Sequence, residues 1–568
     1  MPEISKYYQP ELTLPDLLTR ASAMHPDLFV GYSDKSGNIL CQTYQELLEE
    51  AKRIAAGLYN LGLRKSDKLI IATLTNKETI ELLWGCFLLG VVPTTLQSPV
   101  TFTGINPPVV KLMSVFRQLE QPYIFMSPEL KDVEGLPQGI VKHRTDLKCT
   151  GEFPEPDLKP DDLAFIQFSS GSTGESKGVM LTHRNMMVNM DAIRLGLDLE
   201  YPDVFGNWMP LFHDMGLIGY HLTPIYSMVF QYQLETIDFI MNPGLWLNLM
   251  SRSKVTISGC TNFGLSLVLR HFGRKKPDPD WDFSRMKALL NGAEPISVKT
   301  MKDFIGFLVP YGFKPETMMP VYGMAEATLA VSFAPLRERS VAETFDAFLL
   351  DREHLAKAVG PSDPAARVLS EVGTAINDIY IRIVDDQDNC VAEGTSGHIQ
   401  LKGPSITSGY YNMPETRITA YCGEWLRTGD IGFFFEGRLY ISGRHKDIIF
   451  RNGRHYFAND LEEVAITIDE IKPGKVCYGG VTDEKTNQDK VIAFLAGVPE
   501  QKAIETFQRL RALLRNNLGI STDEVVLLKS NEIPKTSSGK LQRYKLMQRY
   551  LSGEFADRTI GADKLDSL

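Results

Sequence analysis

Residues 168–178 read FSSGSTGESKG, a run of hydroxyl side chains and three glycines with Lys177 near its end. Glycine accepts positive φ angles and lets the backbone come close to a ligand, so the N–H groups and hydroxyls of such a loop can surround a polyphosphate. The apolar run 163–168 in front of it predicts a strand, and residues 184–197 behind it predict a helix with its N-cap near Thr182. The segment therefore predicts a phosphate-binding loop between regular elements.

This loop is not of the GxxxxGK[ST] type, because Gly178 follows Lys177 and no Gly-Lys-Ser or Gly-Lys-Thr triplet occurs in the chain. A flexible Ser/Gly linker is the alternative interpretation. A linker, however, needs neither a strand in front of it nor a lysine within it. We therefore favour phosphate binding.

Outward from this loop, apolar runs alternate with helical patterns, as in residues 68–72, 78–89 and 91–96. Alternation of strand, helix and strand predicts an α/β fold with substantially parallel sheets flanked by helices. Apolar runs at 255–258, 288–290 and 318–321 each lead into a loop that contains glycine. Ligands of open α/β sheets bind at such loops, so we expect one site assembled from distant segments.

The pattern changes near Lys446. A probable hairpin turn at residues 452–453, a helix from 459 or 460, two strands and a helix at 503–518 follow it. About 120 residues of this kind make a small α+β domain. We expect a large domain at residues 1–445 and a smaller, mobile one at 446–568.

Composition excludes several classes of protein. The chain has 568 residues with 43% hydrophobic and 23% charged, which is ordinary globular usage, and a net charge of −10, the wrong sign for a nucleic-acid-binding protein. Residues 1–10 show no apolar signal core, and the longest apolar run, residues 82–92, is too short to span a bilayer. The seven cysteines lie far apart without a CxxC pair. Neither a disulfide framework nor a zinc ribbon is indicated, and a cytoplasmic location is expected.

Five further segments carry candidate site residues: NGAEP (291–295), VYGMAE (321–326), RTGD (427–430), GRHKD (443–447) and PKTSSGK (534–540). Each motif alone could have a purely structural role: Asp430 could cap a turn, Tyr322 could belong to the core and Lys540 could be a solvated lysine. Together with SSGSTGESKGV, and in this order, they resemble the adenylate-forming superfamily of acyl-CoA synthetases, luciferases, peptide-synthetase adenylation domains and fatty acyl-AMP ligases. The resemblance covers nearly the whole chain and implies activation of a carboxylate by ATP as an acyl-AMP.

The resemblance implies a role for each motif. The phosphate loop would bind the β and γ phosphates, residues 292–294 and 322–325 would surround the adenine, Asp430 would hold the ribose hydroxyls, and Glu326 would hold Mg²⁺. Lys540 would bridge the carboxylate and the α-phosphate, and Lys446 would be the interdomain hinge. The cofactor-binding residues implied are Ser169, Ser170, Gly171, Ser172, Thr173, Gly174, Lys177, Gly292, Ala293, Glu294, Tyr322, Gly323, Met324, Ala325, Asp430 and Arg444.

Residues 208–219, WMPLFHDMGLIG, are rich in apolar side chains, as are 226–230 and 261–269, and a pocket lined by them favours an aliphatic chain. In amino-acid adenylation domains an Asp stands about where His213 falls, because a buried ammonium needs a carboxylate. Neighbouring Asp214 keeps the amino-acid alternative open. The expected acyl pocket is Trp208, Met215, Gly216, Tyr226, Asn262 and Phe263, with His213 near the junction of acyl chain and phosphate.

Two features resemble the fatty acyl-AMP ligases in particular. Ala325 stands where most relatives have a phosphate-binding Thr, and 46 residues separate Glu326 from Gly373. That length resembles the insertion of this subfamily, expected at residues 335–370. Within it, the apolar residues Val341, Phe345, Phe348, Leu355 and Val359 fall at helical spacing and predict a segment that docks on the rest of the chain. A tolerated surface insertion is the alternative.

The sequence thus predicts adenylation of a medium- or long-chain fatty acid, followed by transfer to the phosphopantetheine thiol of an acyl carrier protein or a carrier domain of a polyketide or peptide synthase. No cysteine of the chain is needed as a nucleophile. The alternatives are a long-chain acyl-CoA synthetase that uses free CoA, an amino-acid or aryl-acid adenylating enzyme, and an adenylate-binding protein without catalysis.

Overall fold

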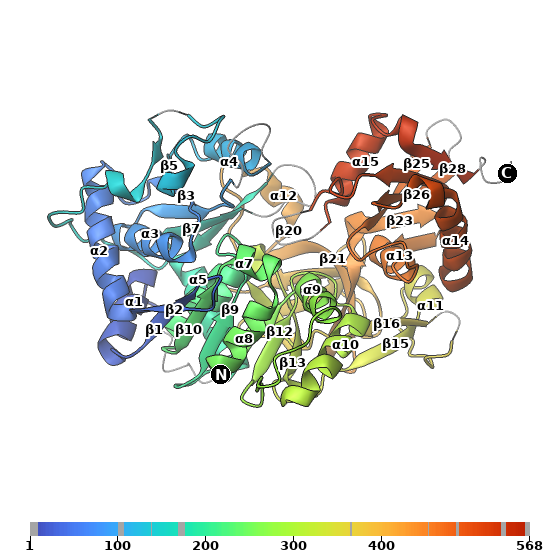
Figure 1. Cartoon of the computed structure of the whole chain (residues 1–568), viewed down its shortest axis with the longest axis horizontal. Coiled ribbons are helices and arrows are strands. Elements are labelled where there is room, and N and C mark those ends of the chain that lie inside the picture. Colours follow the sequence, from blue (N-terminus) through green and yellow to red (C-terminus); the bar gives the residue numbers. More distant parts are fainter. Residues whose placement is uncertain are drawn as a thin grey trace.

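The computed structural model describes residues 9–99, 107–137, 139–168, 176–363, 366–451, 454–483, 488–535 and 541–562. Residues 169–175 of the predicted phosphate loop, Lys540, and the predicted turn at 452–453 lie outside these ranges. Figure 1 shows a larger first part of the chain, coloured blue to yellow-orange, and a smaller C-terminal part in orange and red. No helix in the described ranges has the length and apolarity needed to cross a lipid bilayer.

The largest sheet in the described part of the chain has nine strands, and its central pairs are parallel, which confirms the predicted α/β class. The pairs at its two ends are antiparallel: β1 with β2 at one end, and β13 with β14 and β14 with β17 at the other. The strands in spatial order are β17 (Thr374–Ala375), β14 (Ala330–Phe333), β13 (Met318–Gly323), β12 (Ala288–Asn291), β11 (Ile257–Cys260), β9 (Val204–Asn207), β10 (Phe230–Leu234), β1 (Phe29–Ser33) and β2 (Ile39–Thr43).

A second, parallel sheet of four strands lies beside the first, and helices cover both (Figure 1). Its strands are β4 (Val92–Thr95), β3 (Lys68–Ala72), β5 (Tyr123–Met126) and β6 (Val141–Lys142). The helices of this half of the chain are α1 (Leu14–Met24), α2 (Tyr44–Asn60), α3 (Asn76–Leu89), α4 (Pro107–Gln118), α5 (His183–Gly196), α6 (Thr223–Tyr226), α7 (Thr236–Met241), α8 (Gly244–Arg252), α9 (Asn262–Phe272) and α10 (Val298–Leu308).

The predicted phosphate loop joins two strands. β7 (Leu163–Phe168) ends where the loop begins, and β8 (Gly178–Thr182) pairs antiparallel with β7 before α5 starts. Thr182 is the N-cap of α5, as expected: its hydroxyl accepts a hydrogen bond from the Asn185 N–H. A five-residue strand with buried Val179 and Leu181, which the sequence did not predict, lies between the loop and the helix.

The described residues between 335 and 370 form an antiparallel pair of strands and a short helix, so the expected helical spacing of the segment is wrong. β15 (Ala342–Asp346) pairs antiparallel with β16 (Ala366–Ser370), and α11 (Ala347–Arg352) follows β15 directly. Phe345 is fully buried, whereas Phe348 and Leu355 are exposed. The apolar residues of this segment therefore do not share one helix face, and the docking goes through Phe345.

The Phe345 ring packs in edge contacts against Phe433, Phe435 and Tyr440, with ring centroids 5.0, 5.2 and 5.3 Å away. These three residues belong to an antiparallel sheet that precedes the C-terminal part. Its strands are β18 (Tyr380–Val384), β19 (Gly397–Lys402), β20 (Tyr421–Cys422), β21 (Trp425–Phe435) and β22 (Arg438–Arg444), and α12 (Thr416–Ala420) leads into β20.

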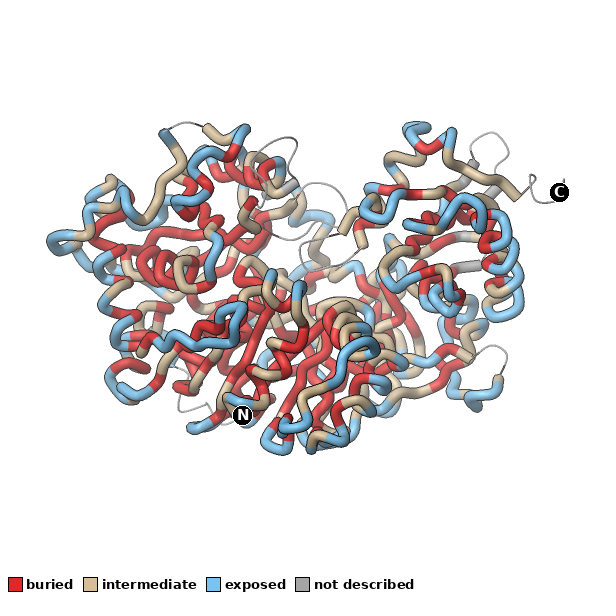
Figure 2. The backbone as a smooth tube through the Cα atoms, in the orientation of Figure 1, coloured by how far each residue is buried: buried red, intermediate tan, exposed pale blue. Residues whose placement is uncertain are grey.

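The C-terminal part has hydrophobic clusters of its own, made only of residues from 449 onward. Figure 2 shows these buried positions as a group separate from the buried strands of the first part. Its elements are β23 (Ile448–Arg451), β24 (Arg454–Phe457), α13 (Ala458–Ala465), β25 (Val476–Asp483), β26 (Gln488–Ala496), α14 (Glu500–Leu518), β27 (Glu524–Leu528), α15 (Arg543–Leu551) and β28 (Thr559–Gly561).

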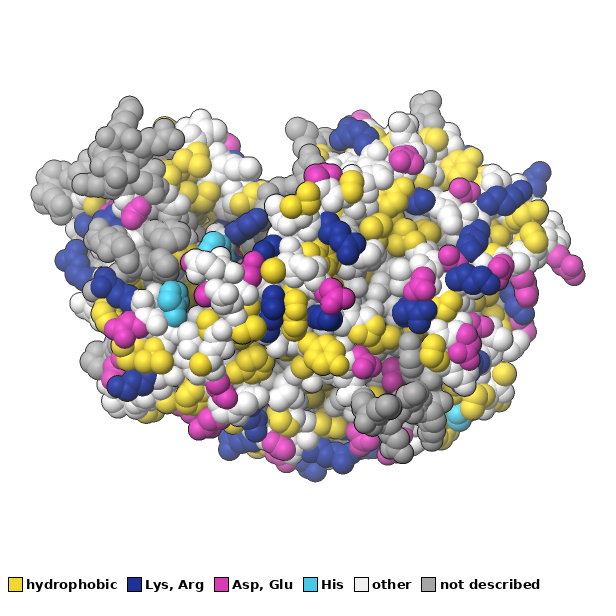
Figure 3. All heavy atoms as spheres, turned by 180° about the vertical axis from the view of Figure 1, so that it is seen from behind, with side chains coloured by type: hydrophobic (Ala, Val, Ile, Leu, Met, Phe, Trp, Pro, Cys, Tyr) yellow, Lys and Arg dark blue, Asp and Glu magenta, His cyan; other side chains and the backbone are white. Residues whose placement is uncertain are grey.

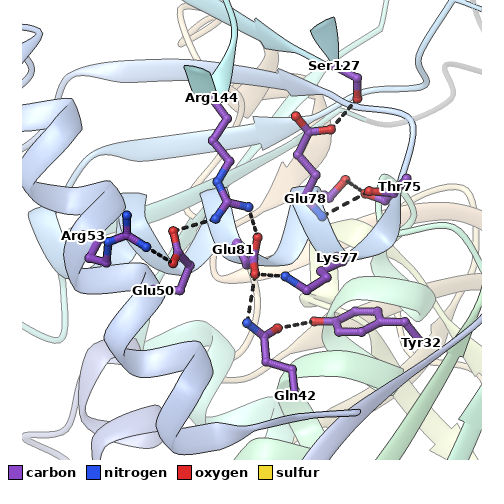
Figure 4. A network of polar contacts seen from close by, with 11 residues as sticks. Tyr32, Gln42, Glu50, Arg53, Thr75, Lys77, Glu78, Glu81, Ser127 and Arg144 are labelled. Atoms are coloured by element: carbon purple, nitrogen blue, oxygen red, sulfur yellow. Dashed lines mark hydrogen bonds and ion pairs between the residues drawn. The ribbon is translucent and has the colours of Figure 1, made fainter. Parts of the chain in front are cut away.

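A polar network ties α2, α3 and the segment after β6 together (Figure 4). The fully buried Glu81 carboxylate forms ion pairs with Lys77 and Arg144, and accepts a hydrogen bond from the Gln42 amide at 2.8 Å. Arg144 also pairs with Glu50 at 2.6 Å. A buried charge is tolerated only with such partners, so this network fixes how α3 sits on the second sheet.

A second buried chain of hydrogen bonds involves His221. The Trp84 Nε1–H donates to His221 Nε2 at 2.9 Å, and His221 Nδ1 lies 2.9 Å from the Gln231 side-chain oxygen. Because Nε2 accepts, Nδ1 carries the proton and the imidazole is neutral. Burial lowers the pKa of His221 to about 4, and that of His183 also to about 4.

Acid should therefore destabilise the fold through His221. In the unfolded chain the imidazole takes up its proton near pH 6.5, so the stability present above that pH is lost as the pH falls from 6.5 toward about 4. The full interval is worth about 3 kcal/mol in the free energy of unfolding. Denaturant titrations at pH 7 and pH 4.5 measure the loss, and His221→Gln should lose less; an equal loss in both proteins would contradict this role.

Candidate active site

The carboxyl ends of the central parallel strands open into a cavity of about 960 Å³. Its walls come from the first part of the chain, with Ala293 after β12 and Tyr322 in β13, and from the C-terminal part, with Glu463 of α13 and Lys535. Seen from behind, the molecule has a notch between the two parts, with charges of both signs mixed over that face (Figure 3). This cavity is therefore the candidate for the predicted site, since distant segments of the chain line it.

Asp430 is buried in β21 and joins two other predicted residues. The Tyr322 hydroxyl donates to Asp430 Oδ2 at 2.6 Å, and Arg444 Nε donates to Oδ1 at 3.1 Å. Asp430 and Arg444 are direct partners across the β21–β22 ladder, which sets this contact through the backbone. Burial and then the Asp430 charge raise the pKa of Tyr322, and Asp430 also raises the pKa of Arg444. The tyrosine is thus held neutral and the guanidinium charged.

Glu326 lies in a single helical turn, residues 325–327, directly after β13. Its Oε1 accepts a hydrogen bond from the Tyr410 hydroxyl at 3.0 Å, and burial raises the pKa of this carboxyl. Lys177, at the far end of the phosphate loop, places its ammonium 4.9 Å from the centre of the Tyr410 ring. Tyr410 therefore links the loop to Glu326, and sequence reasoning missed it because the surrounding SGYYN carries no recognisable motif.

His213 and Asp214 stand at the start of a π-helix, Met215–Leu222. The Met215 N–H donates to Asp214 Oδ1 at 2.7 Å and to His213 Nδ1 at 3.3 Å, and Asp214 Oδ1 lies 2.7 Å from His213 Nδ1. Both side chains line the cavity. The Asp214 carboxylate thus caps the N-terminus of its own π-helix, a position where carboxylates are favoured.

The wall after β12 is shaped by backbone geometry. Ala293 lines the cavity with φ of 68°, a strained value for a residue with a side chain. Gly292 does not line the cavity but supports it, since a Cβ there would lie 2.7 Å from the Val321 carbonyl oxygen of β13. Glu294 Oε1 accepts a hydrogen bond from the Phe263 N–H at 2.7 Å. Asn262 and Phe263 line the cavity beside it, as expected.

One region of the cavity wall is apolar, and its side chains come from α5, the large sheet and the turn after β13. They are Ile193, Leu197, Phe205, Leu290, Leu329 and Phe333, with Met215 adjoining. None of these residues was singled out from the sequence except Met215, because a side chain facing a pocket and one facing the core have the same apolar character.

Three residues of the expected acyl pocket do not line the cavity. Trp208 is buried and stacks on Phe239, with ring centroids 3.8 Å apart. Tyr226 points the other way, toward α1 and α5, and its hydroxyl donates to Asp191 at 2.9 Å. At Gly216 a Cβ would overlap the Pro210 carbonyl oxygen, so this glycine allows a close approach of backbones instead of facing the cavity.

Tyr220 also lines the cavity, and its position depends on a glycine. The ring packs in an edge contact on Phe205 at 5.9 Å, and its hydroxyl lies over Gly259 of β11. A Cβ at position 259 would overlap that hydroxyl oxygen. The missing side chain at 259 thus provides the space for Tyr220.

The C-terminal part contributes charged groups to the cavity wall, among them Arg543 and Glu462, which the sequence motifs did not identify. Arg543 of α15 forms a bidentate pair with the Glu462 carboxylate at 2.9 and 2.6 Å, and reaches Asp447 at 3.1 Å. Lys535 places its ammonium 5.9 Å from the ring centre of Phe263, across the interface. Lys446 lies in the helical turn His445–Asp447 after β22 and lines the cavity as well.

Arg367 of β16 links residues 335–370 to the C-terminal part. Its guanidinium pairs with Asp351 at 2.7 and 2.6 Å and lies 3.0 Å from Asp460 of α13. Burial raises the pKa of Asp460 to about 6 against the lowering effect of Arg367. The segment therefore touches both parts: Phe345 packs on the first, and Arg367 pairs with the second.

Comparison with known proteins agrees with this architecture. The chain is 32% identical to a protein of Caulobacter vibrioides provisionally named an acyl-CoA synthetase, over 93% of both chains. It is 30% identical to JamA, a medium-chain fatty acid–[acyl-carrier-protein] ligase of Moorena producens, over 92% of both chains. Its structure is similar to a solved structure from a study of fatty acyl-adenylate ligases of E. coli and L. pneumophila, with a TM-score of 0.87 and 29% identity over 97% of this chain and 99% of that one.

The resemblance noted in the sequence is confirmed at the level of the family. Residues 23–411, well over half of the chain, match the family of AMP-binding enzymes. They include β7, β12 and β13, each of which contributes residues to the cavity wall. The chain belongs to the AMP-binding enzyme family.

Proposed function

We propose that this protein activates a medium- or long-chain fatty acid with ATP, forming acyl-AMP and pyrophosphate, and then passes the acyl group to the phosphopantetheine thiol of an acyl carrier protein or carrier domain. The observation that carries the proposal is one cavity with two kinds of wall. Tyr322, Asp430 and Arg444 form a polar region, and the seven side chains around Leu197 and Phe333 form an apolar one. Such a cavity suits a nucleotide joined to an aliphatic chain.

In this proposal the buried Asp430 carboxylate receives the ribose hydroxyls. It is already oriented by two donors, so little reorganisation is needed when the nucleotide arrives. Tyr322 packs against the base, and Ala293 and Glu294 bound it from the next strand. His213 stands at the junction of acyl chain and phosphate. Lys177 and the phosphate loop hold the leaving pyrophosphate, and Lys540 approaches the reacting oxygens from the C-terminal part.

Glu326 fits Mg²⁺. The described residues contain no group of three His, Cys, Asp or Glu side chains that could hold a metal unaided. Mg²⁺ typically binds through one or two carboxylates together with phosphate oxygens and water, so a single carboxylate fixed by Tyr410 is a suitable protein ligand. When bound with the nucleotide, the ion would neutralise phosphate charge.

A fatty acid is favoured over an amino acid by the apolar wall. A bound ammonium would require a free carboxylate near His213, and the Asp214 carboxylate already accepts the Met215 N–H at the start of the π-helix. The seven apolar side chains named above carry no charge. Discrimination of chain length should be gradual, because each methylene contributes only about 0.8 kcal/mol.

The test is fatty-acid-dependent release of pyrophosphate, with acyl-AMP identified by mass spectrometry. Activity with amino acids or aryl acids but not with fatty acids would reject the proposed substrate class. Exchange between ATP and labelled pyrophosphate separates a catalyst from an adenylate-binding protein.

The acceptor is tested separately, by comparing a phosphopantetheinylated carrier protein with free CoA. Faster transfer to the carrier is expected. Equal transfer would favour the second candidate, an acyl-CoA synthetase, for which the Caulobacter relative is the specific observation.

A further inference from the structure

One face of the helix α9 leads from the interior of the cavity to its rim. Its residues on the cavity wall follow one another at about one helical turn: Asn262, Phe263, Ser266 and Arg270. Lys535 of the C-terminal part lies beside the first turn, with its ammonium 5.9 Å from the Phe263 ring centre (Figure 1). Arg270, two turns further along, lines the cavity and is exposed to solvent, so it stands at the rim.

Positive charge continues from this rim onto the surface of the molecule. The basic patch, as we name it, consists of four exposed cations: Arg270, Arg274, Lys275 and Lys276. Residues 262–277 contain no acidic side chain, although the whole chain has a net charge of −10. In the described part of the chain none of the four forms an ion pair, whereas Lys299 on the neighbouring helix α10 pairs with Asp303 at 2.6 Å. The patch is thus a local concentration of cations without internal compensation.

Helix stability explains only part of this charge. A cation in the last turn of a helix is favoured by the helix dipole, and this accounts for Arg270. The other three cations lie beyond Phe272, where α9 ends, and the dipole effect falls off within the last turn. The helix end is itself firmly anchored, because the Phe272 ring packs on Trp281 and Phe307, with ring centroids 5.1 and 5.5 Å away. The patch therefore lies on a fixed support, which lowers the entropy cost of binding a partner.

The place of the patch at the cavity rim indicates which partner it fits. In the second step of the proposed function an acceptor thiol must enter the cavity. A carrier protein is far larger than a cavity of about 960 Å³, so its body stays outside while its phosphopantetheine arm reaches in. Carrier proteins are acidic, and an acidic surface is complementary to a rim that bears four cations.

We propose that the basic patch is the docking surface for the acidic face of the acyl carrier protein, and that the phosphopantetheine arm enters the cavity along α9. The inference rests on the proposed function in taking a carrier protein as the acceptor, and it adds the surface on which that carrier binds. The patch and α9 belong to the first part of the chain, so a turn of the C-terminal part leaves the docking surface in place.

The test is the double variant Lys275→Glu with Lys276→Glu, assayed with the carrier protein that the wild-type enzyme uses in the acceptor assay above. The KM for the carrier should rise roughly tenfold or more, with kcat unchanged at saturating carrier, because attraction at two positions becomes repulsion. Added salt should raise the KM of the wild type and affect the variant less. Fatty-acid-dependent pyrophosphate release should stay unchanged, as should transfer to pantetheine, a thiol that carries neither phosphate nor protein. Both lysines are exposed, so the variant should fold normally.

Lys52→Glu with Lys148→Glu is the matched control, because it makes the same change in net charge at two exposed lysines on and beside α2, far from α9 (Figure 1). It should leave the KM for the carrier unchanged.

An unchanged KM for the carrier in the Lys275 and Lys276 variant would overturn the proposal. An equal rise in the KM for free CoA would also overturn it, because the patch would then bind the phosphates of the acceptor and not the body of the carrier. Lost binding to phosphatidylglycerol vesicles with an unchanged carrier KM would assign the patch to a lipid surface instead. A failure of the proposed function appears earlier, as a wild-type enzyme without fatty-acid-dependent pyrophosphate release or without transfer to any carrier.

Discussion

Replacing Asp430 with asparagine should lower kcat/KM for ATP by about a hundredfold or more. The carboxylate accepts one hydrogen bond from Tyr322 and one from Arg444. An amide keeps a single acceptor oxygen, loses the charge, and turns an NH₂ donor toward one of those two donors. Hydrogen bonds to charged groups contribute about 1.5–3 kcal/mol each, so the loss of one and the weakening of the other to a neutral acceptor account for the expected effect. Steady-state pyrophosphate release with varied ATP is the measurement.

Tyr322→Phe is the matched control for this prediction. It keeps the ring and removes only the donor to Asp430, so a smaller loss of roughly tenfold is expected. Because both changes act on one carboxylate, the double variant should be little worse than Asp430→Asn alone. Full additivity of the two losses, or a wild-type kcat/KM in Asp430→Asn, would show that the carboxylate is not the organising group.

Removing the ion pair between Arg367 and Asp460 should raise acyl transfer to free CoA roughly tenfold to a hundredfold. We propose that the C-terminal part turns about Lys446 between adenylation and thiol transfer, and that residues 335–370 restrain this turn. Arg367 lies 3.0 Å from Asp460, while Phe345 holds the same segment on the first part. Rotation must break that pair, and a buried pair costs several kcal/mol to break when each charge is left alone.

Asp460→Asn is the variant of choice, because Arg367 then keeps its bidentate pair with Asp351 and no buried charge is left without a partner. Adenylation, measured as pyrophosphate release, should stay near the wild-type rate, and the CoA thioester is quantified by mass spectrometry. Arg352→Gln is the control, since Arg352 sits on α11 with its guanidinium 5.2 Å from the Phe348 ring centre. An unchanged CoA rate in a folded Asp460→Asn variant would refute the restraint.

Much of the fold could be predicted because buried strands appear in the sequence as runs of apolar residues. Residues 68–72 and 163–168 are strands with the predicted bounds, since each is a mostly apolar run in which every residue after the first is buried. The pairing of β7 with β8 could not be predicted from the sequence, because residues 178–182 form only a short apolar run next to a helix with a strong N-cap. The insertion was misread for another reason: Phe345 alternates with polar neighbours in β15, and five apolar residues spread over nineteen positions match a helical period by chance.

For the candidate site, polar residues were easier to place than apolar ones. Tyr322 lies near the end of β13 and meets Asp430, which is paired with Arg444 across β21 and β22. A polar residue at such a buried position has few structural uses. Trp208 and Tyr226 flank His213 along the chain, yet one faces the core and the other faces α1. Aromatic character does not reveal which way a side chain points. The residues of the apolar wall could therefore be identified only from the three-dimensional structure.

The space above Gly259 has a consequence for how related chains can diverge. The Tyr220 hydroxyl occupies the volume that a side chain at 259 would need, and the ring of Tyr220 forms part of the cavity wall. A larger residue at 259 is tolerated only if position 220 becomes smaller or its ring turns toward the bound chain. The two positions should therefore change together over evolution, and a substitution in a β-strand that never meets the substrate would reshape the room available to it.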